Sequence, residues 1–265
     1  MREFESQSSM STLIRCGLQY YFRYVEDIKT PPAVAMIRGT AGHKGTEHNY
    51  IQKIDSRVDC SLDEVLDATS DEWNSQTEYI EDWEDKRPEK VKDGLMSLMK
   101  VVHKDLHPII QPVEVEQEFI VDIAGQKFRG FPDVIAELGN DLIIDDNKFT
   151  NKARSQGDVD FDLQGTIYTY AKKIKNFAFD CAVQTDAGNQ YINRKIGTRD
   201  ESDWQKLESR VRLFKKAVEA QTFYPCDPAS WQCSKKWCGY WNICEQGDKN
   251  RGAVNFDMKP SQSIL

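Results

Sequence analysis

Residues 130–148, GFPDVIAELGNDLIIDDNK, contain two short apolar runs separated by a Gly-Asn pair. A Gly-Asn pair between two such runs predicts a β-hairpin. Side chains alternate between the two faces of a strand, so Asp146 and Lys148 should point the same way and Asp145 the opposite way. Asp133 lies at the start of the neighbouring strand. We therefore expect the hairpin to bring two carboxylates and a lysine together.

This grouping has the chemistry of a metal site for phosphate hydrolysis. Oxygen ligands such as Asp133 and Asp146 suit Mg²⁺ or Mn²⁺. Lys148 beside the cation would orient a water molecule or stabilise charge on a phosphate. The alternative is an ordinary surface hairpin with solvated charges. The strongly apolar runs argue against it, because an unpaired carboxylate in a buried strand is costly.

Composition sets the broad class of the protein. The 265 residues are 39% hydrophobic, enough for one large domain, and no apolar run is long enough to cross a membrane. The first residues lack the apolar segment of a secretory signal, so we expect a cytoplasmic protein with no membrane partner. The net charge of −8 argues against a generally basic nucleic-acid coat protein, although a local basic groove is compatible with it.

Hydrophobic periodicity predicts an α/β (α+β) protein in which helices precede and follow groups of strands. The expected helices cover residues 8–25, 36–54, 61–84, 90–106, 159–175 and 200–220. The expected strands cover 113–123, 127–137 and 141–149, which form a meander, and 176–186 and 190–197. We expect one compact unit divided into a helical region at 1–110, a core at 111–222, a cysteine-rich segment at 223–248 and a tail at 249–265.

Two pairs of residues, each four positions apart on predicted helices, add to the hairpin. His43 and Glu47 lie in the glycine-rich sequence GTAGHKGTE, where His43 is a candidate nitrogen ligand. The order of these residues lacks the spacing of helical metalloprotease motifs. Gln164 and Tyr168 lie on the helix after the third strand and should pack near the end of that strand. Taken alone, either pair is more typical of ordinary structure.

In this order, GxxxHxxxE, PD, DxK and QxxxY resemble the RecB-type branch of the PD-(D/E)xK nuclease superfamily. The resemblance implies a restriction-endonuclease-like core with a central mixed sheet flanked by helices. It also implies that His43, Asp133 and Asp146 ligate the metal with help from the carbonyl of Asn147, and that Glu47 supports the site. Lys148 would position the attacking water, and Gln164 and Tyr168 would organise the site and the DNA strand. Glu116 or Glu118, on the first strand of the meander, is a further possible contributor.

Three of the seven cysteines, Cys233, Cys238 and Cys244, form a C-x4-C-x5-C group near the C-terminus. A fourth ligand would come from Cys226 or from Cys16. Four thiolates hold zinc or an iron-sulfur cluster equally well, so spacing does not decide the metal. Free, partly buried thiols are the plain alternative. The aromatic residues around the group would shield a cluster or stack on DNA bases: Trp231, Trp237, Tyr240 and Trp241.

One N-terminal and three C-terminal cysteines are similar to the iron-sulfur subset of these nucleases, which includes AddB-type nuclease domains and the CRISPR-associated exonucleases. That resemblance implies a [4Fe-4S] cluster on Cys16, Cys233, Cys238 and Cys244, with Cys226 as the main rival to Cys16. The C-terminal spacing departs from the more usual C-x2-C-x5-C.

The function that this resemblance implies is metal-dependent hydrolysis of DNA, as an exonuclease on single-stranded ends. DNA would be the substrate, and a recombination or spacer-integration protein a possible partner, in repair, CRISPR or phage DNA processing. The sequence has no GxxxxGK[ST] phosphate-binding loop, so we expect a nuclease without a motor. Two rivals are a non-catalytic DNA-binding adaptor with the same fold and a zinc-stapled binding protein without a nuclease site.

Overall fold

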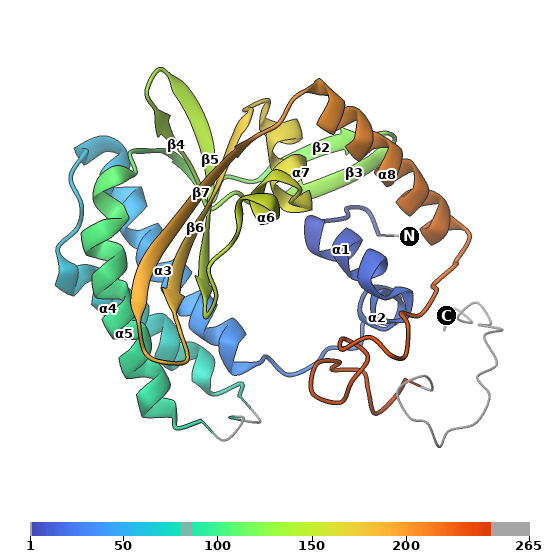
Figure 1. Ribbon diagram of the computed structural model, residues 1–265, viewed down its shortest axis with the longest axis horizontal. Helices are drawn as coiled ribbons and strands as arrows, with labels where there is room; N and C mark the ends of the chain where they lie inside the picture. The colour runs from blue at the N-terminus through green and yellow to red at the C-terminus, as the bar shows by residue number, and fades with distance from the viewer. Residues whose placement is uncertain (1, 81–82, 84–85, 245–265) are drawn as a thin grey trace. The chain divides into compact units, whose positions relative to one another are not determined.

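The computed structural model describes residues 2–80, 83 and 86–244 (Figure 1). The predicted tail at 249–265 and the end of the predicted cysteine-rich segment, 245–248, lie outside these residues. The chain divides into two compact units. One, here the cysteine unit, contains Met1–Arg2, Ser8–Thr30 and Lys216–Leu265; the other, here the sheet unit, contains Glu3–Gln7 and Pro31–Lys215.

The sheet unit contains a mixed sheet with the strand order β1-β4-β5-β6-β7 and a separate β2-β3 pair. Strands β5 and β6 are parallel, and their connection passes through helices α6 and α7. The other neighbours in the main sheet are antiparallel. The strands are β1 (Pro112–Val115), β2 (Phe119–Ile123), β3 (Gln126–Gly130), β4 (Val134–Leu138), β5 (Asp141–Thr150), β6 (Asn176–Gln184) and β7 (Gln190–Thr198).

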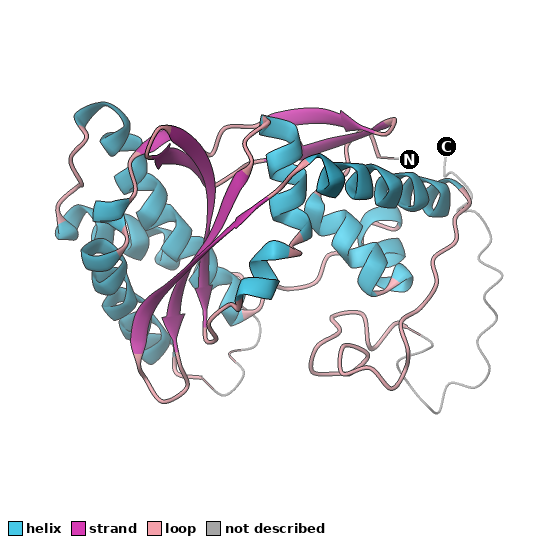
Figure 2. Ribbon diagram, turned by 45° about the horizontal axis from the view of Figure 1, so that its top comes forward, coloured by secondary structure: helices cyan, strands magenta, loops and turns pink. Residues whose placement is uncertain are grey.

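Helices pack on both faces of the main sheet (Figure 2). Helices α3 and α5 contact one face, and α4 packs against both of these helices. Helices α6 and α7 contact β5, β6 and β7. The helices of the described chain are α1 (Gln7–Arg15), α2 (Gly17–Tyr20), α3 (Val34–Ser56), α4 (Leu62–Thr77), α5 (Pro88–Asp105), α6 (Gln156–Asp160), α7 (Leu163–Lys172) and α8 (Glu201–Glu219), with a π-helical turn at Tyr21–Val25 and a 3₁₀ turn at His107–Ile109.

This mixed sheet flanked by helices confirms the predicted fold class and is consistent with a restriction-endonuclease-like core. No helix of the described residues is long and apolar enough to cross a membrane.

The predicted three-strand meander is wrong in one respect. Each of its first two strands is broken, and the outer halves β2 and β3 form their own sheet. The first break lies at Glu116, whose φ of 50° cannot continue a strand. The second contains Pro132, which has no N–H to donate to a neighbouring strand. The two breaks adjoin, since the Glu116 N–H donates to the Asp133 carbonyl at 3.2 Å.

Two predicted helices are also interrupted. The helix expected at 159–175 is split because Asp162 caps α7, its side chain accepting a hydrogen bond from the Gly165 N–H at 2.7 Å. The helix expected at 8–25 is split at Cys16, whose backbone is extended with φ −162°. In both cases the periodic apolar pattern continues across a residue that leaves the helical conformation.

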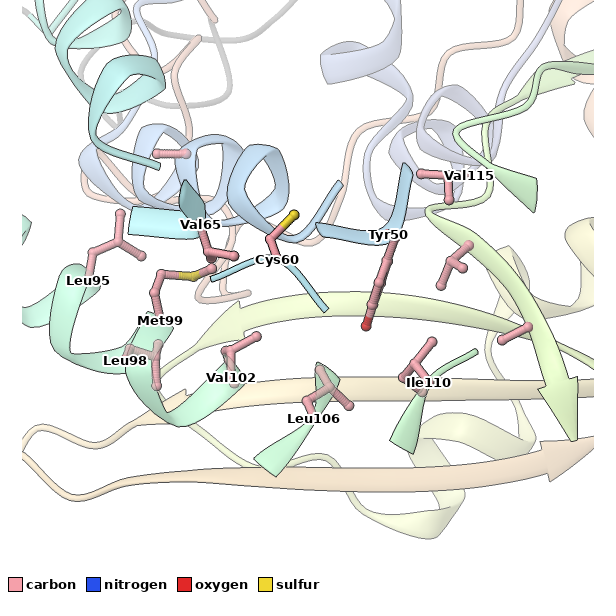
Figure 3. Packing of buried hydrophobic residues seen from close by; sticks show 14 of the residues in the cluster. Tyr50, Cys60, Val65, Leu95, Leu98, Met99, Val102, Leu106, Ile110 and Val115 are labelled. Carbon is pink, nitrogen blue, oxygen red and sulfur yellow. The ribbon is translucent and has the colours of Figure 1, made fainter. Parts of the chain in front are cut away.

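The core of the sheet unit lies between the sheet and helices α3, α4 and α5 (Figure 3). Two glycines let α3 pack closely. A Cβ on Gly45 would lie 2.0 Å from the Thr69 hydroxyl of α4, and one on Gly42 would lie 2.5 Å from the Phe149 ring of β5. The glycine-rich start of α3 thus fits it against both neighbours, which holds His43 near β5.

Candidate active site

Strands β4 and β5 place Asp133 beside Asp146. Val134 pairs with Asp145 in the antiparallel register, so the residue before β4 lies next to the residue after Asp145. Asp133 Oδ2 accepts a hydrogen bond from the Asn147 N–H at 2.7 Å. The Asp146 side chain is 1% exposed. The predicted meeting of two carboxylates at this end of the hairpin is therefore present in the structure.

Helix α3 brings His43 to the same place. His43 Nδ1 lies 3.3 Å from Asp133 Oδ2. Burial lowers the pKa of His43, but the charge and hydrogen bond of Asp133 outweigh burial, so the pKa lies above its ordinary value. Burial acts to raise the pKa of Asp133, and the positive charges of His43 and Lys148 overcome it, so that pKa is lowered. Asp133 is thus held ionised by its neighbours.

Lys148 forms an ion pair with Asp146 Oδ2. Burial, the largest effect, and the charge of Asp133 together raise the pKa of Asp146 to about 7, although Lys148 opposes the shift. The pKa of Lys148 is raised above its ordinary value, because Asp146 and Asp133 outweigh the effect of burial. The lysine is therefore a cation at neutral pH.

The Gln164 amide links these groups. Its Nε2 donates to Asp146 Oδ1 at 2.6 Å and to the Tyr168 hydroxyl at 3.2 Å, while its Oε1 accepts from Lys148 Nζ at 3.3 Å. The Tyr168 hydroxyl donates in turn to the Phe131 carbonyl at 3.2 Å, just before Pro132. The structure therefore joins the predicted QxxxY and DxK residues in one hydrogen-bonded network.

Three glutamates named from the sequence differ in position. Glu47 lies one turn beyond His43 and pairs with Lys44 at 2.9 Å. Burial raises the pKa of Glu116 to about 7, with further contributions from the charges of Asp133, Glu47 and Asp146, so Glu116 belongs to the same electrostatic group. Glu118 instead pairs with Arg129 at 3.3 Å and is 45% exposed.

The donor set of this group fits a hard divalent cation. Two buried neighbouring carboxylates repel each other, and a cation between them offsets both the repulsion and the cost of burial. Asn147, expected to assist through its carbonyl, lies between Asp146 and Lys148 and is 3% exposed. Within residues 2–80, 83 and 86–244, no three His, Cys, Asp or Glu side chains are already arranged to ligate a metal ion. The fit rests on the chemistry of the carboxylates.

A second charged group, which the motifs in the sequence did not indicate, lies on the opposite face of β5. Arg194 of β7 reaches Asp180 Oδ2 at 2.5 Å and Asp145 Oδ1 at 3.1 Å. Both carboxylate side chains are 0% exposed. Burial raises the pKa of Asp180 to about 6 and that of Asp145 well above its ordinary value, and Arg194 opposes both shifts. The only signal in the sequence was the alternation that turned Asp145 away from Asp146.

The side chain of Tyr50 points from α3 into the core of the sheet unit (Figure 3). Its hydroxyl is buried, and no hydrogen-bond partner for it is seen in the described part of the chain. Burial, followed by the charges of Asp180 and Asp145, raises its pKa well above the ordinary value. The sheet therefore carries charged groups on both faces at the level of the predicted site.

In the cysteine unit, five cysteines line one cavity: Cys16, Cys226, Cys233, Cys238 and Cys244. The Gly17 N–H donates to the Tyr224 carbonyl at 2.7 Å, which joins the N-terminal segment to the C-terminal one. A Cβ on Gly17 would lie 2.5 Å from that backbone, so the approach requires glycine. The structure thus brings the four predicted cluster cysteines together and adds Cys226.

The sulfur atoms interact with one another and with polar neighbours. Cys16 Sγ accepts from the Cys226 N–H at 3.4 Å, and Cys238 Sγ accepts from Gln19 Nε2 at 3.3 Å. Burial and the neighbouring Cys16 raise the pKa of Cys226 to about 12. A thiolate donor set of this kind suits zinc or an iron-sulfur cluster. Among the described side chains these cysteines are not arranged as a formed metal site, so their role as ligands stays a prediction.

The surrounding aromatic residues separate into two groups. Tyr240 and Trp241 line the cavity. Trp231 and Trp237 contact each other edge to face at 5.6 Å and are 66% and 59% exposed. Of the four aromatic residues expected to shield the cysteines, two therefore lie at the cavity and two are mainly in solvent.

Three comparisons with known proteins bear on the family of this chain. The model of the PD-(D/E)XK nuclease superfamily matches residues 5–245. No curated protein sequence matches the chain. The crystal structure of a "Putative exonuclease" from Eubacterium rectale is similar in fold, with 10% sequence identity, 87% of each chain covered and a TM-score of 0.56. The crystal structure of SSO0001 has 15% sequence identity to this chain and a TM-score of 0.40. The match covers 93% of this chain and 88% of the SSO0001 chain. With a family model that spans nearly all of its length, the chain belongs to the PD-(D/E)XK nuclease superfamily.

Proposed function

We propose that the chain is a metal-dependent deoxyribonuclease that hydrolyses phosphodiester bonds from DNA ends. The observation that carries this proposal is the meeting of Asp133, Asp146 and Lys148, all linked through buried or half-buried contacts at one end of the β4–β5 hairpin. Membership of the nuclease superfamily supports the reaction class and DNA as the substrate.

In this proposal Asp133, Asp146 and His43 hold Mg²⁺ or Mn²⁺, with the carbonyl of Asn147 assisting. A bound divalent cation supplies Lewis-acid stabilisation of the charge that develops on the phosphate. As a ligand, neutral His43 would offer Nε2 while Nδ1 keeps its contact with Asp133 Oδ2. Glu47 would support the site from the next turn of α3, and a bound cation would favour the ionised form of Glu116, whose pKa burial raises to about 7.

Lys148 stabilises charge and orients water, and does not act as a base. Its raised pKa keeps the ammonium protonated at neutral pH, so it has no lone pair with which to accept a proton from water. A cation at this position stabilises an attacking hydroxide and the phosphate oxygens. Gln164, which contacts both Asp146 and Lys148, keeps the pair aligned, and Tyr168 holds Gln164 in place.

Lys148→Ala tests this role. We expect the variant to lose cleavage while it retains most of its affinity for DNA, since the substitution removes a group that acts on the reacting phosphate. Lys104→Ala is the matched control, because the Lys104 side chain is 83% exposed on α5. Cleavage by Lys148→Ala at the wild-type rate would show that the site is assigned wrongly.

We propose single-stranded ends as the preferred substrate, within a cytoplasmic recombination, repair, CRISPR or phage pathway that includes a recombination or spacer-integration partner. These points come from the family resemblance of the motifs. We propose that the segments differ in role, with 1–110 supplying His43 and the first cluster cysteine, Cys16, 111–222 the nuclease core and 223–248 the other cysteine ligands. Exonuclease assays on single-stranded and duplex DNA, labelled at either end, test the preference and the polarity.

We also propose that the cysteine cavity binds a [4Fe-4S] cluster through Cys16, Cys233, Cys238 and Cys244. Cys226 remains the rival fourth ligand, because it lines the same cavity and contacts Cys16. Cys238→Ser should remove the cluster and destabilise the cysteine unit, since the ligands come from both ends of the chain. Cys60→Ser is the control, because Cys60 is buried in the core of the sheet unit.

Iron, sulfide and zinc analysis of anaerobically purified protein, together with its visible absorption, decides the metal. Iron and sulfide that are lost in Cys238→Ser but kept in Cys60→Ser support the cluster. Stoichiometric zinc without visible absorption would support the zinc-stapled alternative, and a stable metal-free protein would remove both. Comparison of Cys16→Ser with Cys226→Ser identifies the fourth ligand.

A further inference from the structure

The loop between β5 and α6 carries an arginine beside the proposed catalytic lysine. Arg154 Cζ lies 5.7 Å from the centroid of the Phe179 ring, and Lys148 Nζ lies 5.6 Å from the same centroid. Phe179, on β6, is 3% exposed, so its ring is a fixed part of the sheet unit. One buried ring therefore holds both cations in the same neighbourhood.

The backbone that carries Arg154 is fixed at several points. The Arg154 N–H donates to Asn193 Oδ1 of β7 at 3.1 Å. The next residue, Ser155, caps α6, and its N–H donates to Asp158 Oδ2 at 2.7 Å. An exposed side chain on such an anchored loop starts from a defined position, which reduces the entropy lost when it binds a ligand.

Two carboxylates that interact with the charge of the arginine, those of Asp158 and Asp162, form hydrogen bonds to other groups. Asp158 bonds to Ser155, and Asp162 caps α7 through the Gly165 N–H at 2.7 Å. Both feel the positive charge of Arg154. In the part of the chain that the structure describes, no ion pair of Arg154 is present. The guanidinium thus keeps its donors available for a ligand from solution.

We propose that Arg154 binds a backbone phosphate of the DNA next to the phosphate that is cleaved. The inference rests on the proposed nuclease function and adds a substrate-binding residue to it. A planar guanidinium donates two parallel hydrogen bonds to phosphate oxygens, which a lysine cannot do. In a chain with a net charge of −8, attraction of DNA must come from local cations such as this one.

The alternative is that Arg154 only packs its aliphatic chain on Phe179. Two variants distinguish this packing role from phosphate binding. Arg154→Met keeps an apolar side chain of similar length and removes the charge, whereas Arg154→Lys keeps the charge and removes the bidentate guanidinium donors. The control is Arg57→Met. Arg57 is 60% exposed and follows α3, fourteen residues after His43, which is about 21 Å along a helix.

The test measures binding and cleavage separately. Fluorescence anisotropy with a labelled single-stranded oligonucleotide, in the cleavage-deficient Asp146→Asn background with EDTA, gives Kd over a range of salt concentrations. We expect Arg154→Met to weaken binding about tenfold or more. The slope of log Kd against the logarithm of the salt concentration should fall by about 0.7, which corresponds to the loss of one phosphate contact on a single strand. Arg154→Lys should keep the slope and recover part of the affinity.

In the active background, Arg154→Met should raise KM more than it lowers kcat. The proposal is overturned if Arg154→Met binds DNA as tightly as Arg57→Met and has the same salt slope. A wild type that fails to cleave DNA with any metal would refute the nuclease function, but the binding data would still decide the role of Arg154. A wild type that cleaves, with Arg154→Met unchanged in Kd and KM, would refute this inference alone.

Discussion

Replacement of Arg194 by methionine would leave two buried carboxylates without their cation. Asp145 and Asp180 have fully buried side chains, and Arg194 contacts both, at 3.1 and 2.5 Å. Removal of one partner from a buried ion pair costs about 3–5 kcal/mol, because the remaining charge is neither solvated nor paired. We therefore expect Arg194→Met to lose about 3–5 kcal/mol of unfolding free energy near neutral pH.

The loss should depend on pH. The pKa of Asp180 in the folded protein, about 6, lies above its ordinary value, and that of Asp145 is also raised. The folded state therefore binds more protons than the unfolded state, and this proton binding stabilises it. The stabilisation is lost as the pH rises through the folded-state pKa of Asp180, about 6. Without Arg194 both pKa values rise further. The penalty should be largest at about pH 8 and smaller at about pH 5, where the carboxyls become neutral.

Urea unfolding at these two pH values measures the effect, with Arg57→Met as the control. Arg57 pairs with Glu137 at 2.9 Å, but the side chains are 60% and 43% exposed, so that pair should contribute only about 0–1 kcal/mol. The reasoning would be refuted if Arg194→Met and Arg57→Met were destabilised equally at both pH values.

Two further predictions concern the site and its support. Gln164→Leu should lower kcat or the apparent Mn²⁺ affinity about 10- to 100-fold while the fold is retained, because the amide that aligns Asp146 with Lys148 is lost. Metal titrations of the cleavage rate measure this effect, and wild-type values would contradict the prediction. Gly45→Ala should destabilise the protein by about 1–3 kcal/mol, because a Cβ there meets α4 at 2.0 Å. Gly39→Ala, in the same helix, should stabilise the protein by about 0.5–1 kcal/mol, because a Cβ on Gly39 would have no atom within 4 Å. Equal effects of the two substitutions in thermal unfolding would show that α3 is not closely packed at Gly45.

The sequence allowed prediction of the features that depend on local pattern. A Gly-Asn turn between apolar runs and the two-residue period of a strand were enough to place Asp146 with Lys148 and to turn Asp145 away. The four-residue spacing of Gln164 and Tyr168 placed both on one helix face, where the structure finds them bonded to each other. These relations lie within one element or across one tight turn.

The features that depend on tertiary packing were not predictable in the same way. The first break in the meander requires a left-handed Glu116 and the contact of its N–H with the Asp133 carbonyl, neither of which has a local sequence signal, whereas Pro132 marks the second break in the sequence. The buried ion pairs of Arg194 depend on the order of three strands. Spacing left the choice between Cys16 and Cys226 open, and only the tertiary contact of the two chain segments shows that both line the same cavity.

The most direct test of the central claim is cleavage of end-labelled single-stranded and duplex DNA with Mn²⁺, Mg²⁺ or EDTA by wild type, Asp146→Asn and Asp141→Asn. Asp141 is the exposed first residue of the same strand. We predict that wild type and Asp141→Asn release label only with a divalent metal and that Asp146→Asn releases none. Cleavage in EDTA, or by Asp146→Asn at the wild-type rate, would contradict the assigned site. DNA binding without cleavage in any metal would instead identify a non-catalytic adaptor with a nuclease fold.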